Sequence, residues 1–478
     1  MATKVTIIGA GPAGYQAAIR AAQLGGRVTL VERAAVGGTC LHRGCIPTKA
    51  LKATAEALAR AKDLEQYGIR GGGDCAVDMT AVLERQARIV DTLTQGIEKL
   101  LQAHGVQVLQ GHGRLEGPGR VSLAGEGGTQ VIESDAVILA SGSRPGDLPG
   151  LAADGELVLN SDHALALSQV PESLAVVGGG VVGCEFAMIM AGLGCRVTVI
   201  EALERLLPLP NIDPDLSKVL AREMKKRRIA VHTAKVVTKL ERTGDGARLT
   251  LGPSPLVPGA KSKEAVVEAA RVLVSVGRRL ADDELGLERA GVARGEDGAV
   301  AVDSFLRTNL PGVWAVGDLL GPRRPMLAHV AGAEGVAAAA GALGLAETVS
   351  YQVVPSAIFT SPEVAAVGLG QAQAAELGYQ ARANVFQMRT LGRAQAGGEI
   401  AGFCKLVSDQ DGRLLGAQII GARATDLVAE CALALKLGAT VADLAGTMHA
   451  HPTLAEAVHE AAEDALGLGL HSMPPRRK

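Results

Sequence analysis

Apolar runs and glycine turns follow one another in the same order in two separate stretches of the chain. Residues 5–33 and 175–202 each begin with an apolar run typical of a strand, pass through a glycine turn into a helix of small residues, and end in a second apolar run after a Gly break. The two stretches therefore indicate an internal repeat of a strand–helix–strand unit, and the expected fold class is α/β.

Each copy carries the pattern G-x-G-x-x-G between its first strand and its helix. The glycines are Gly9, Gly11 and Gly14 in the first copy and Gly178, Gly180 and Gly183 in the second. The first glycine makes the tight turn, the second lets the backbone approach a pyrophosphate, and the third lets the helix pack closely on its strand. Glu32 and Glu201 close the second strand at the same offset, where each can accept a hydrogen bond from a ribose hydroxyl. We therefore predict two dinucleotide-binding units.

Glu201 also predicts which nicotinamide cofactor the second unit takes. A carboxylate at this position favours a free ribose 2′-hydroxyl and repels a 2′-phosphate, which indicates NAD rather than NADP. Arg196 and Arg205 lie nearby in the sequence, and we interpret them as solvated charges rather than as phosphate ligands.

A third segment points to flavin in the first unit. Residues 308–318 form a short strand that ends in Gly317-Asp318, and an Asp at the carboxyl end of a strand can hold the ribityl chain of FAD. Alone, this pair could be a simple turn. Together with Gly142 in residues 140–145, it suggests that the chain returns to a flavin domain after the second unit.

The seven cysteines include one closely spaced pair, Cys40 and Cys45. The odd number of cysteines and the lack of an export signal indicate a reducing, cytosolic setting, in which such a pair is more often catalytic or metal-binding than structural. An undistorted helix would not bridge the two thiols, but Gly44 offers the distortion that a short disulfide loop needs. A thiol near a helix N-terminus also has a lowered pKa. The alternatives are a metal site, which lacks neighbouring ligands, and two inert thiols.

A histidine near the C-terminus is a candidate general base. His451 precedes a proline, which favours an extended conformation outside a helix, and Glu456 lies in the helical pattern after it. A carboxylate bonded to one imidazole nitrogen fixes the tautomer and raises the basicity of the other nitrogen. His449 and His459 are the rival candidates.

Composition excludes several other classes of protein. The 478 residues predict about three domains, and the net charge of −2 leaves no basic excess for nucleic acid. With 47% hydrophobic and 21% charged residues, disorder is not expected. No uncharged apolar run reaches roughly 18 residues, so no membrane span is expected.

The motifs together resemble those of the FAD-dependent pyridine nucleotide–disulfide oxidoreductases, from Val5 to about Leu466. Residues 37–49 match the family's GGxCxxxGCxPxK segment and residues 449–456 match its HxHPTxxE segment. Residues 354–364 resemble the opening of its dimerisation domain. Within the family, the resemblance is to the members that oxidise dihydrolipoyl groups.

This resemblance implies two Rossmann-like dinucleotide-binding domains, for FAD and NAD, and a C-terminal α+β dimerisation domain. The implied boundaries are 1–145 for the FAD domain, 146–277 for the NAD domain, 278–347 for a central domain that completes the FAD site, and 348–478 for the dimerisation domain. It further implies a cytoplasmic homodimer without nucleic acid. Its partners would be lipoyl domains of 2-oxo acid dehydrogenase complexes or of the glycine cleavage system.

The resemblance also assigns roles to residues. Cys40 would exchange with the substrate, Cys45 would face the flavin, and His451 of the other subunit, oriented by Glu456, would be the base. Lys49 would lie beside the flavin ring, paired with Glu185. Besides the repeated glycines, Glu32, Glu201, Lys49, Glu185 and Asp318, the residues expected to bind FAD or NAD are Pro12, Ala13, Arg33, Gly38, Thr39, Gly113, Ser141, Gly142, Val181, Val182, Val236, Gly277, Arg278, Met326, Leu327 and Ala328. No metal is expected.

The implied reaction is the oxidation of dihydrolipoyl groups to lipoyl disulfide, with NAD as the electron acceptor. The alternatives are a reductase of another disulfide or of mercuric ion, and a non-catalytic subunit of a 2-oxo acid dehydrogenase complex. Two departures from the family pattern bear on substrate choice and on access to the flavin. They are His42-Arg43, where many members have Asn and an apolar residue, and a loop at residues 321–324 that is longer than usual.

Overall fold

The first repeated unit folds into a parallel five-stranded sheet. The computed structural model describes residues 2–71, 73–260 and 264–472. The strands of this sheet lie in the order β18-β7-β1-β2-β3. Their bounds are β1 Lys4–Ile8, β2 Arg27–Glu32, β3 Gln107–Gln110, β7 Ala136–Leu139 and β18 Val313–Ala315. The edge strand β18 comes from far along the chain, as the predicted return to the flavin domain requires.

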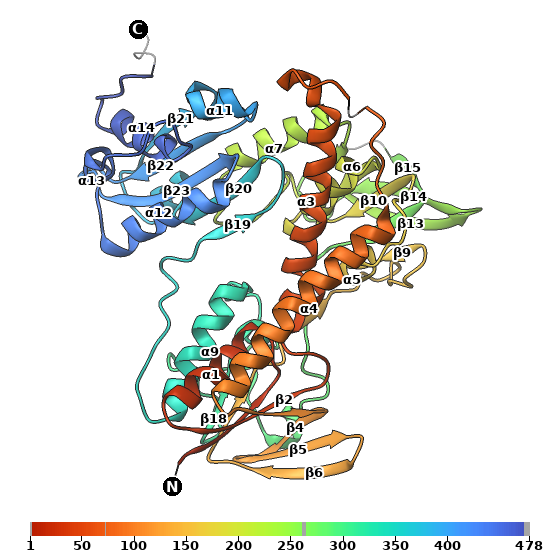
Figure 1. Ribbon diagram of the computed structural model, residues 1–478, viewed down its shortest axis with the longest axis vertical. Coiled ribbons are helices and arrows are strands. Elements are labelled where there is room, and N and C mark those ends of the chain that lie inside the picture. The colour runs from red at the N-terminus through yellow and green to blue at the C-terminus, as the bar shows by residue number, and fades with distance from the viewer. Residues whose placement is uncertain (1, 72, 261–263, 473–478) are drawn as a thin grey trace.

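The helices of this unit pack on the sheet through small residues. Helix α1 (Pro12–Gln23) comes directly after the first glycine turn, and α9 (Ala328–Ala342) lies beside it in Figure 1. The packing is close enough that a Cβ on Gly335 would lie 2.2 Å from the carbonyl oxygen of Ala13. An antiparallel meander stands between β3 and β7 and consists of β4 His112–Gly117, β5 Arg120–Gly125 and β6 Gly128–Glu133.

The second unit repeats this plan, which confirms the predicted fold class. Its parallel sheet has the order β12-β11-β10-β16-β9. The bounds are β9 Val158–Leu159, β10 Ser173–Val177, β11 Arg196–Ile200, β12 Ala230–His232 and β16 Arg271–Val274. A second meander again stands before the last strand of the repeat and consists of β13 Lys235–Thr243, β14 Gly246–Pro253 and β15 Ala265–Ala269. The helices of this unit are α5 Ser161–Leu165, α6 Val181–Gly192 and α7 Pro214–Lys226.

The first unit carries an insertion that the second unit lacks. Between β2 and β3 the chain forms α2 (Gly38–Arg43), α3 (Cys45–Lys62), a short 3-10 helix η1 (Leu64–Tyr67) and the long α4 (Met79–Ala103). The two long helices α3 and α4 stand out beside the sheets in Figure 1. Helix α3 packs against α6, and therefore joins the insertion to the second unit.

Short elements join the two units. The chain leaves the first unit through β8 (Ser143–Pro145) and returns through β17 (Arg278–Leu280), and these two strands pair in an antiparallel ladder. Helix α8 (Leu287–Ala290) and the 3-10 helix η2 (Gly317–Leu320) come next. The predicted ends of the FAD domain at residue 145 and of the NAD domain at residue 277 lie at this pair of strands. Both domain boundaries stay predictions.

The C-terminal domain is an antiparallel sheet with helices, which agrees with the predicted α+β class. The strand order is β19-β20-β23-β22-β21. The strands are β19 Ser356–Ile358, β20 Glu363–Gly368, β21 Arg382–Gln387, β22 Phe403–Ser408 and β23 Leu414–Gly421. The helices are α10 Gln371–Glu376, α11 Gly392–Gly397, α12 Ala424–Leu437, α13 Val441–Gly446 and α14 Glu456–Ala465, with the 3-10 helix η3 at Met388–Thr390. Figure 1 shows this domain set apart from the first unit and linked to it by one extended segment.

Candidate active site

The two glycine turns have the same stereochemistry. Gly9 has φ +102°, and a Cβ there would lie 2.4 Å from the carbonyl oxygen of Ala140, the residue directly after the neighbouring strand β7. Gly178 has φ +110°, and its Cβ would lie at the same 2.4 Å from the carbonyl oxygen of Ser275. Only glycine fits such positions, because the backbone is left-handed and the space is filled. By contrast, a Cβ on Gly180 would meet open space, which is where a phosphate can approach.

The two acidic residues brace these turns. Glu32 accepts hydrogen bonds from the backbone N–H groups of Ala10 (2.7 Å) and Ala34 (2.8 Å). Glu201 accepts them at the corresponding positions, from Gly179 (2.5 Å) and Leu203 (2.7 Å). Each carboxylate oxygen has a second acceptor position, so a ribose hydroxyl can still be bound. The acids thus shape the glycine turn, a role that the sequence analysis did not assign, while their contact with a ribose stays a prediction.

Arg205 is not a solvated charge, and the interpretation of it from the sequence needs refinement. Its guanidinium donates to the carbonyl oxygens of Leu207 (2.7 Å) and Leu209 (2.9 Å) and to the hydroxyl of Ser217 (2.9 Å). A guanidinium held in this way is a brace of the loop after β11. Arg196, by contrast, is exposed and pairs with Glu172 at 3.2 Å.

A cleft at the carboxyl ends of β1 and β2 brings many of the predicted FAD residues together. Gly9, Glu32, Arg33, Gly113 and Ser141 all line it. The buried hydroxyl of Ser141 has no hydrogen-bond partner among the residues that the structure describes. An orphaned buried polar atom in a cleft of this kind indicates a polar ligand. These residues therefore fit the adenosine and pyrophosphate parts of a dinucleotide.

Asp318 lies at the start of η2, at the carboxyl end of β18, where the sequence placed it. Its carboxylate accepts a hydrogen bond from Ser143 (2.5 Å), and Arg278 donates to the same hydroxyl (2.7 Å). Glu334 of α9 accepts the N–H of Gly317 at 2.6 Å and thereby fixes the turn. Ser143 and Glu334 were not predicted. The sequence signal for Glu334 was a lone carboxylate in a run of Ala and Gly, where a charge needs a buried partner.

The other predicted cofactor residues lie at helix starts and loop ends. Pro12 and Ala13 open α1, Gly38 and Thr39 open α2, and Val181 and Val182 open α6. Met326, Leu327 and Ala328 stand at the start of α9, while Gly142 and Gly277 adjoin the β8–β17 ladder. Val236 is in β13. Their contact with cofactor stays a prediction.

The cysteine pair sits where two helices meet at an abrupt break. Gly44, with φ −146° and ψ −110°, separates α2 from α3, so that Cys45 is the first residue of α3. The two thiols share a hydrogen bond, which lowers the pKa of Cys45 to about 7 and raises that of Cys40. Lys49 lowers the pKa of Cys45 further, and burial opposes the change. The predicted distortion at Gly44 is confirmed, and Cys45 is the thiol with the greater thiolate fraction at neutral pH.

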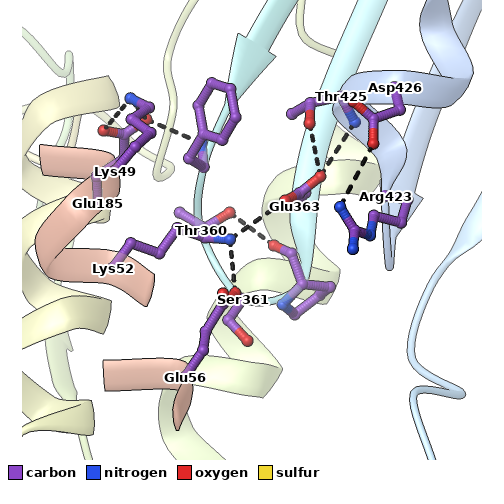
Figure 2. A network of polar contacts seen from close by, with 12 residues as sticks. Lys49, Lys52, Glu56, Glu185, Thr360, Ser361, Glu363, Arg423, Thr425 and Asp426 are labelled. Carbon is purple, nitrogen blue, oxygen red and sulfur yellow. Dashed lines mark hydrogen bonds and ion pairs between the residues drawn. The ribbon is translucent and has the colours of Figure 1, made fainter. Parts of the chain in front are cut away.

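Lys49 and Glu185 form the expected ion pair. The ammonium lies 3.0 Å from the carboxylate, one turn along α3 from Cys45. Glu185 also accepts the N–H of Phe359 at 2.8 Å, and Lys49 lies over the Phe359 ring, 4.1 Å from its centroid. Figure 2 shows this group between α3, α6 and the segment before β20. Phe359 was missed in the sequence analysis, because no local pattern relates it to Lys49.

His451 and Glu456 form the predicted pair. Nδ1 of His451 lies 2.7 Å from the Glu456 carboxylate, and the N–H of Thr453 donates to the same carboxylate at 2.8 Å. Burial would raise the pKa of Glu456, but these two hydrogen bonds outweigh it and the pKa is lowered. The His451 side chain is 77% exposed, and its Nε2 has no hydrogen-bond partner within the described part of the chain. That nitrogen is therefore free to take a proton.

The rival histidines are less suited to be the base. His449 is only 7% exposed, and both its nitrogens are engaged, Nδ1 with the carbonyl oxygen of Thr447 (2.9 Å) and Nε2 with Glu430 (2.8 Å). His459 lies in α14 and pairs with Glu463 at 3.5 Å. The sequence does not show that both nitrogens of His449 are occupied, because Glu430 belongs to another helix, α12.

Metal sites and membrane spans are the other features to consider. The described residues contain no cluster of three or more His, Cys, Asp or Glu side chains arranged to hold a metal ion. No helix in the same ranges is both long enough and apolar enough to cross a bilayer.

Comparison with known proteins places the chain in a family. Residues 3–335 match the model of the pyridine nucleotide-disulphide oxidoreductases, and residues 354–462 match the dimerisation domain of the same family. The chain is 40% identical to the dihydrolipoyl dehydrogenase of Chlamydia muridarum, over 99% of this chain and 98% of that protein. It is 41% identical to the dihydrolipoyl dehydrogenase of Haloferax volcanii, over 98% of each.

A solved structure agrees over nearly the whole chain. The crystal structure of LpdA from Mycobacterium tuberculosis has a TM-score of 0.87 with 29% identity, and the match covers 97% of this chain and 99% of that one. The resemblance inferred from the motifs is confirmed, and so is the expectation of an enzyme. This chain belongs to the pyridine nucleotide–disulphide oxidoreductases, a family of enzymes that use FAD and NAD, and it includes that family's dimerisation domain.

Proposed function

We propose that the protein oxidises dihydrolipoyl groups to lipoyl disulfide and passes the electrons to NAD. The observation that carries this proposal is the joint presence of a redox pair and a base. Cys45 has a lowered pKa beside Lys49, and His451 is oriented by Glu456 with one nitrogen free. Two relatives that match nearly the whole chain at 40% and 41% identity are dihydrolipoyl dehydrogenases. A non-catalytic subunit would not need a thiol with a lowered pKa or a histidine oriented by a carboxylate.

The chain's own residues supply the thiol–disulfide steps. Nε2 of His451 takes the proton of one substrate thiol, and the resulting thiolate attacks Sγ of Cys40 in the Cys40–Cys45 disulfide. The disulfide breaks and Cys45 leaves as a thiolate, which its lowered pKa favours. The proton of the second substrate thiol passes to Cys40 as its sulfur attacks the substrate sulfur of the mixed disulfide, which releases Cys40 as a thiol and closes the lipoyl disulfide. Two thiols are oxidised and one protein disulfide is reduced.

The residues of the two glycine turns fit the dinucleotides that complete the reaction. Gly9, Glu32, Ser141 and Asp318 would hold FAD, which supplies two-electron transfer from the Cys45 thiolate to the nicotinamide when it is bound. Gly178, Gly180, Gly183 and Glu201 would hold NAD. The carboxylate of Glu201 would select against NADP by repelling its 2′-phosphate.

The quaternary arrangement is also proposed. The dimerisation domain supports a homodimer, in which His451 of one subunit serves Cys40 and Cys45 of the other. In one chain, no hydrogen bond joins His451 to either cysteine in the ranges that the structure describes. The partners would be lipoyl domains of 2-oxo acid dehydrogenase complexes or of the glycine cleavage system, met in the cytoplasm.

A steady-state assay of the purified FAD-loaded protein tests the proposal. Dihydrolipoamide with NAD should give ping-pong kinetics, while glutathione disulfide with NADPH and mercuric ion with NADPH should give little turnover. The matched control is Cys40→Ser, which should lose dihydrolipoamide turnover. Faster turnover of glutathione disulfide or mercuric ion would instead support one of the reductase alternatives. No turnover of any of the three would contradict the proposed enzyme.

A further inference from the structure

Helix α3, which begins at Cys45, is fastened to the C-terminal domain by a second lysine. Lys52 lies three residues after Lys49 and therefore on a neighbouring part of the same helix face. Its ammonium lies 3.2 Å from Glu363, the first residue of β20, and 2.6 Å from Glu56. Figure 2 shows Lys52 between these two carboxylates. The exposed fractions of the Lys52 and Glu363 side chains are only 11% and 14%, so the pair is largely withdrawn from water.

Glu363 has a second partner on the opposite side. Its other carboxylate oxygen accepts the hydroxyl of Thr425 (2.7 Å) and the N–H of the same residue (3.2 Å). Thr425 is in the first turn of α12, where free N–H groups and the helix dipole favour a carboxylate. Glu363 therefore caps α12 while it pairs with Lys52. The cap is not a local one, because it comes from a strand 62 residues earlier.

Helix α12 in turn holds the segment that carries the base. Glu430, near the middle of α12, binds Nε2 of the buried His449 at 2.8 Å. His449 stands two residues before His451, in the stretch between α13 and α14 that has no helix or strand. One line of contacts therefore runs from the helix of the redox cysteines, through Lys52, Glu363 and α12, to the base-bearing segment 447–455.

We propose that Glu363 is a positioning residue that couples the placement of the redox cysteines to the placement of His451. The proposal rests on the proposed function, in which the cysteines of one subunit work with His451 of the other. Within one chain, the line then links the cysteine half of one active site to the histidine half of the second. Lys52 and Glu363 are not proposed to contact substrate or cofactor. They act by fixing the position of α3 relative to α12.

Hydrogen–deuterium exchange of the FAD-loaded protein tests the coupling without reference to activity. Lys52→Gln should speed amide exchange in the first turns of α3. It should also speed exchange about tenfold in residues 447–455, which Lys52 does not contact. Glu363→Gln should do both more strongly, and Glu363→Asp should restore part of the protection. The control Asp426→Asn removes an exposed ion pair with Arg423 (3.7 Å) in the same turn of α12 and should change neither segment.

Kinetics separate positioning from a purely structural role. With dihydrolipoamide, kcat of Lys52→Gln should fall about tenfold, because a small displacement of reacting groups is costly. The KM for NAD, the FAD content and the oxidation of NADH by artificial acceptors should stay unchanged. Faster exchange confined to α3, or normal kcat despite faster exchange in both segments, would overturn the coupling. A wild type that fails to oxidise dihydrolipoamide would overturn the proposed function, while the exchange result would still decide the link between α3 and residues 447–455.

Discussion

The two dinucleotide-binding units of this chain are built alike but do different work. Both have a five-stranded parallel sheet and an antiparallel meander inserted at the same point of the repeat. Both also have a carboxylate that accepts one backbone N–H of the glycine turn and one from two residues further along the chain. They differ in the segment after the second strand. The second unit continues into a loop and α7, whereas the first inserts α2, α3 and α4, and with them Cys40 and Cys45.

This difference shows how one binding unit becomes a redox centre. The glycine turn, the acid and the sheet are enough to bind a dinucleotide, and they are common to both units. The chemistry comes from an insertion that the turn does not specify, at the carboxyl end of the same sheet, where ligands of open α/β sheets bind. Substitutions in each unit should therefore separate the binding of the dinucleotides from the thiol–disulfide reaction.

The largest effect is expected from the cysteine pair Cys40 and Cys45, which lies in the insertion of the first unit and has no counterpart in the second. Cys40→Ser and Cys45→Ser should both abolish dihydrolipoamide turnover, because the disulfide cannot form, yet both should keep FAD. In Cys40→Ser the free Cys45 thiolate should give a long-wavelength absorption band against the oxidised flavin, and Cys45→Ser should lose that band. Exposed Cys75→Ser is the matched control and should behave as wild type. A band that survives only in Cys45→Ser would reverse the assignment of the two thiols.

The same band gives a pH prediction. A folded pKa of about 7, lowered from the ordinary thiol value by the hydrogen bond from Cys40 and by Lys49, means that the thiolate is present above that pH and is protonated below it. In the two-electron-reduced protein, the band should therefore grow as pH rises through about 7. A spectrophotometric titration measures it. A midpoint near that of an unperturbed thiol would show that Cys45 is not activated by its surroundings.

The next largest effects are expected from substituting the third glycine of each turn, which should weaken binding of one cofactor at a time. A Cβ would lie 1.7 Å from the carbonyl oxygen of Gly9 in Gly14→Ala and 1.8 Å from that of Gly178 in Gly183→Ala. Gly14→Ala should yield protein without FAD, whereas Gly183→Ala should stay yellow while its KM for NAD rises by about 100-fold. Absorbance at the flavin band and steady-state kinetics measure the two losses. Gly96→Ala, in open space on α4, is the control and should change neither.

These predictions show which parts of the site the sequence could specify. The glycine turns, Glu32, Glu201 and the break at Gly44 result from short-range spacing, and the structure places them as that spacing predicts. The pair Lys52–Glu363 and the contact of Ser143 with Arg278 join residues more than a hundred positions apart. No local pattern encodes such contacts, because they depend on how the domains pack.

The choice between His449 and His451 shows the same limit. The sequence offered two histidines in one motif, and only the fold reveals that Glu430 and the carbonyl oxygen of Thr447 occupy both nitrogens of His449. Arg205 was likewise interpreted as a solvated charge. The sequence does not show that the loop after β11 turns back so that its carbonyl groups face the guanidinium.

An effect of about the same size as that of Gly183→Ala is expected for the base, which neither unit supplies. His451→Gln should reduce dihydrolipoamide oxidation by ~100-fold or more, with FAD content and dimer mass unchanged. Glu456→Gln should cost about tenfold, because it removes the orientation of the ring rather than the proton acceptor. Stopped-flow reduction of the flavin by dihydrolipoamide measures the affected step. Normal reduction in His451→Gln would transfer the role to His449.

The last comparison is between the two acids, Glu32 and Glu201. Each accepts two backbone N–H groups, so the change to Ala leaves two donors unpaired and should weaken cofactor binding by roughly 1–3 kcal/mol, or about 5-fold to 150-fold. Glu32→Ala should loosen FAD and leave the preference for NAD over NADP intact. Glu201→Ala should keep FAD and narrow that preference by about tenfold, because NAD loses a partner while the repulsion of a 2′-phosphate disappears. The ratio of kcat/KM for the two nucleotides measures the change. Equal values in the wild type would remove the basis for assigning selectivity to Glu201, and the two acids would then differ only in which turn they brace.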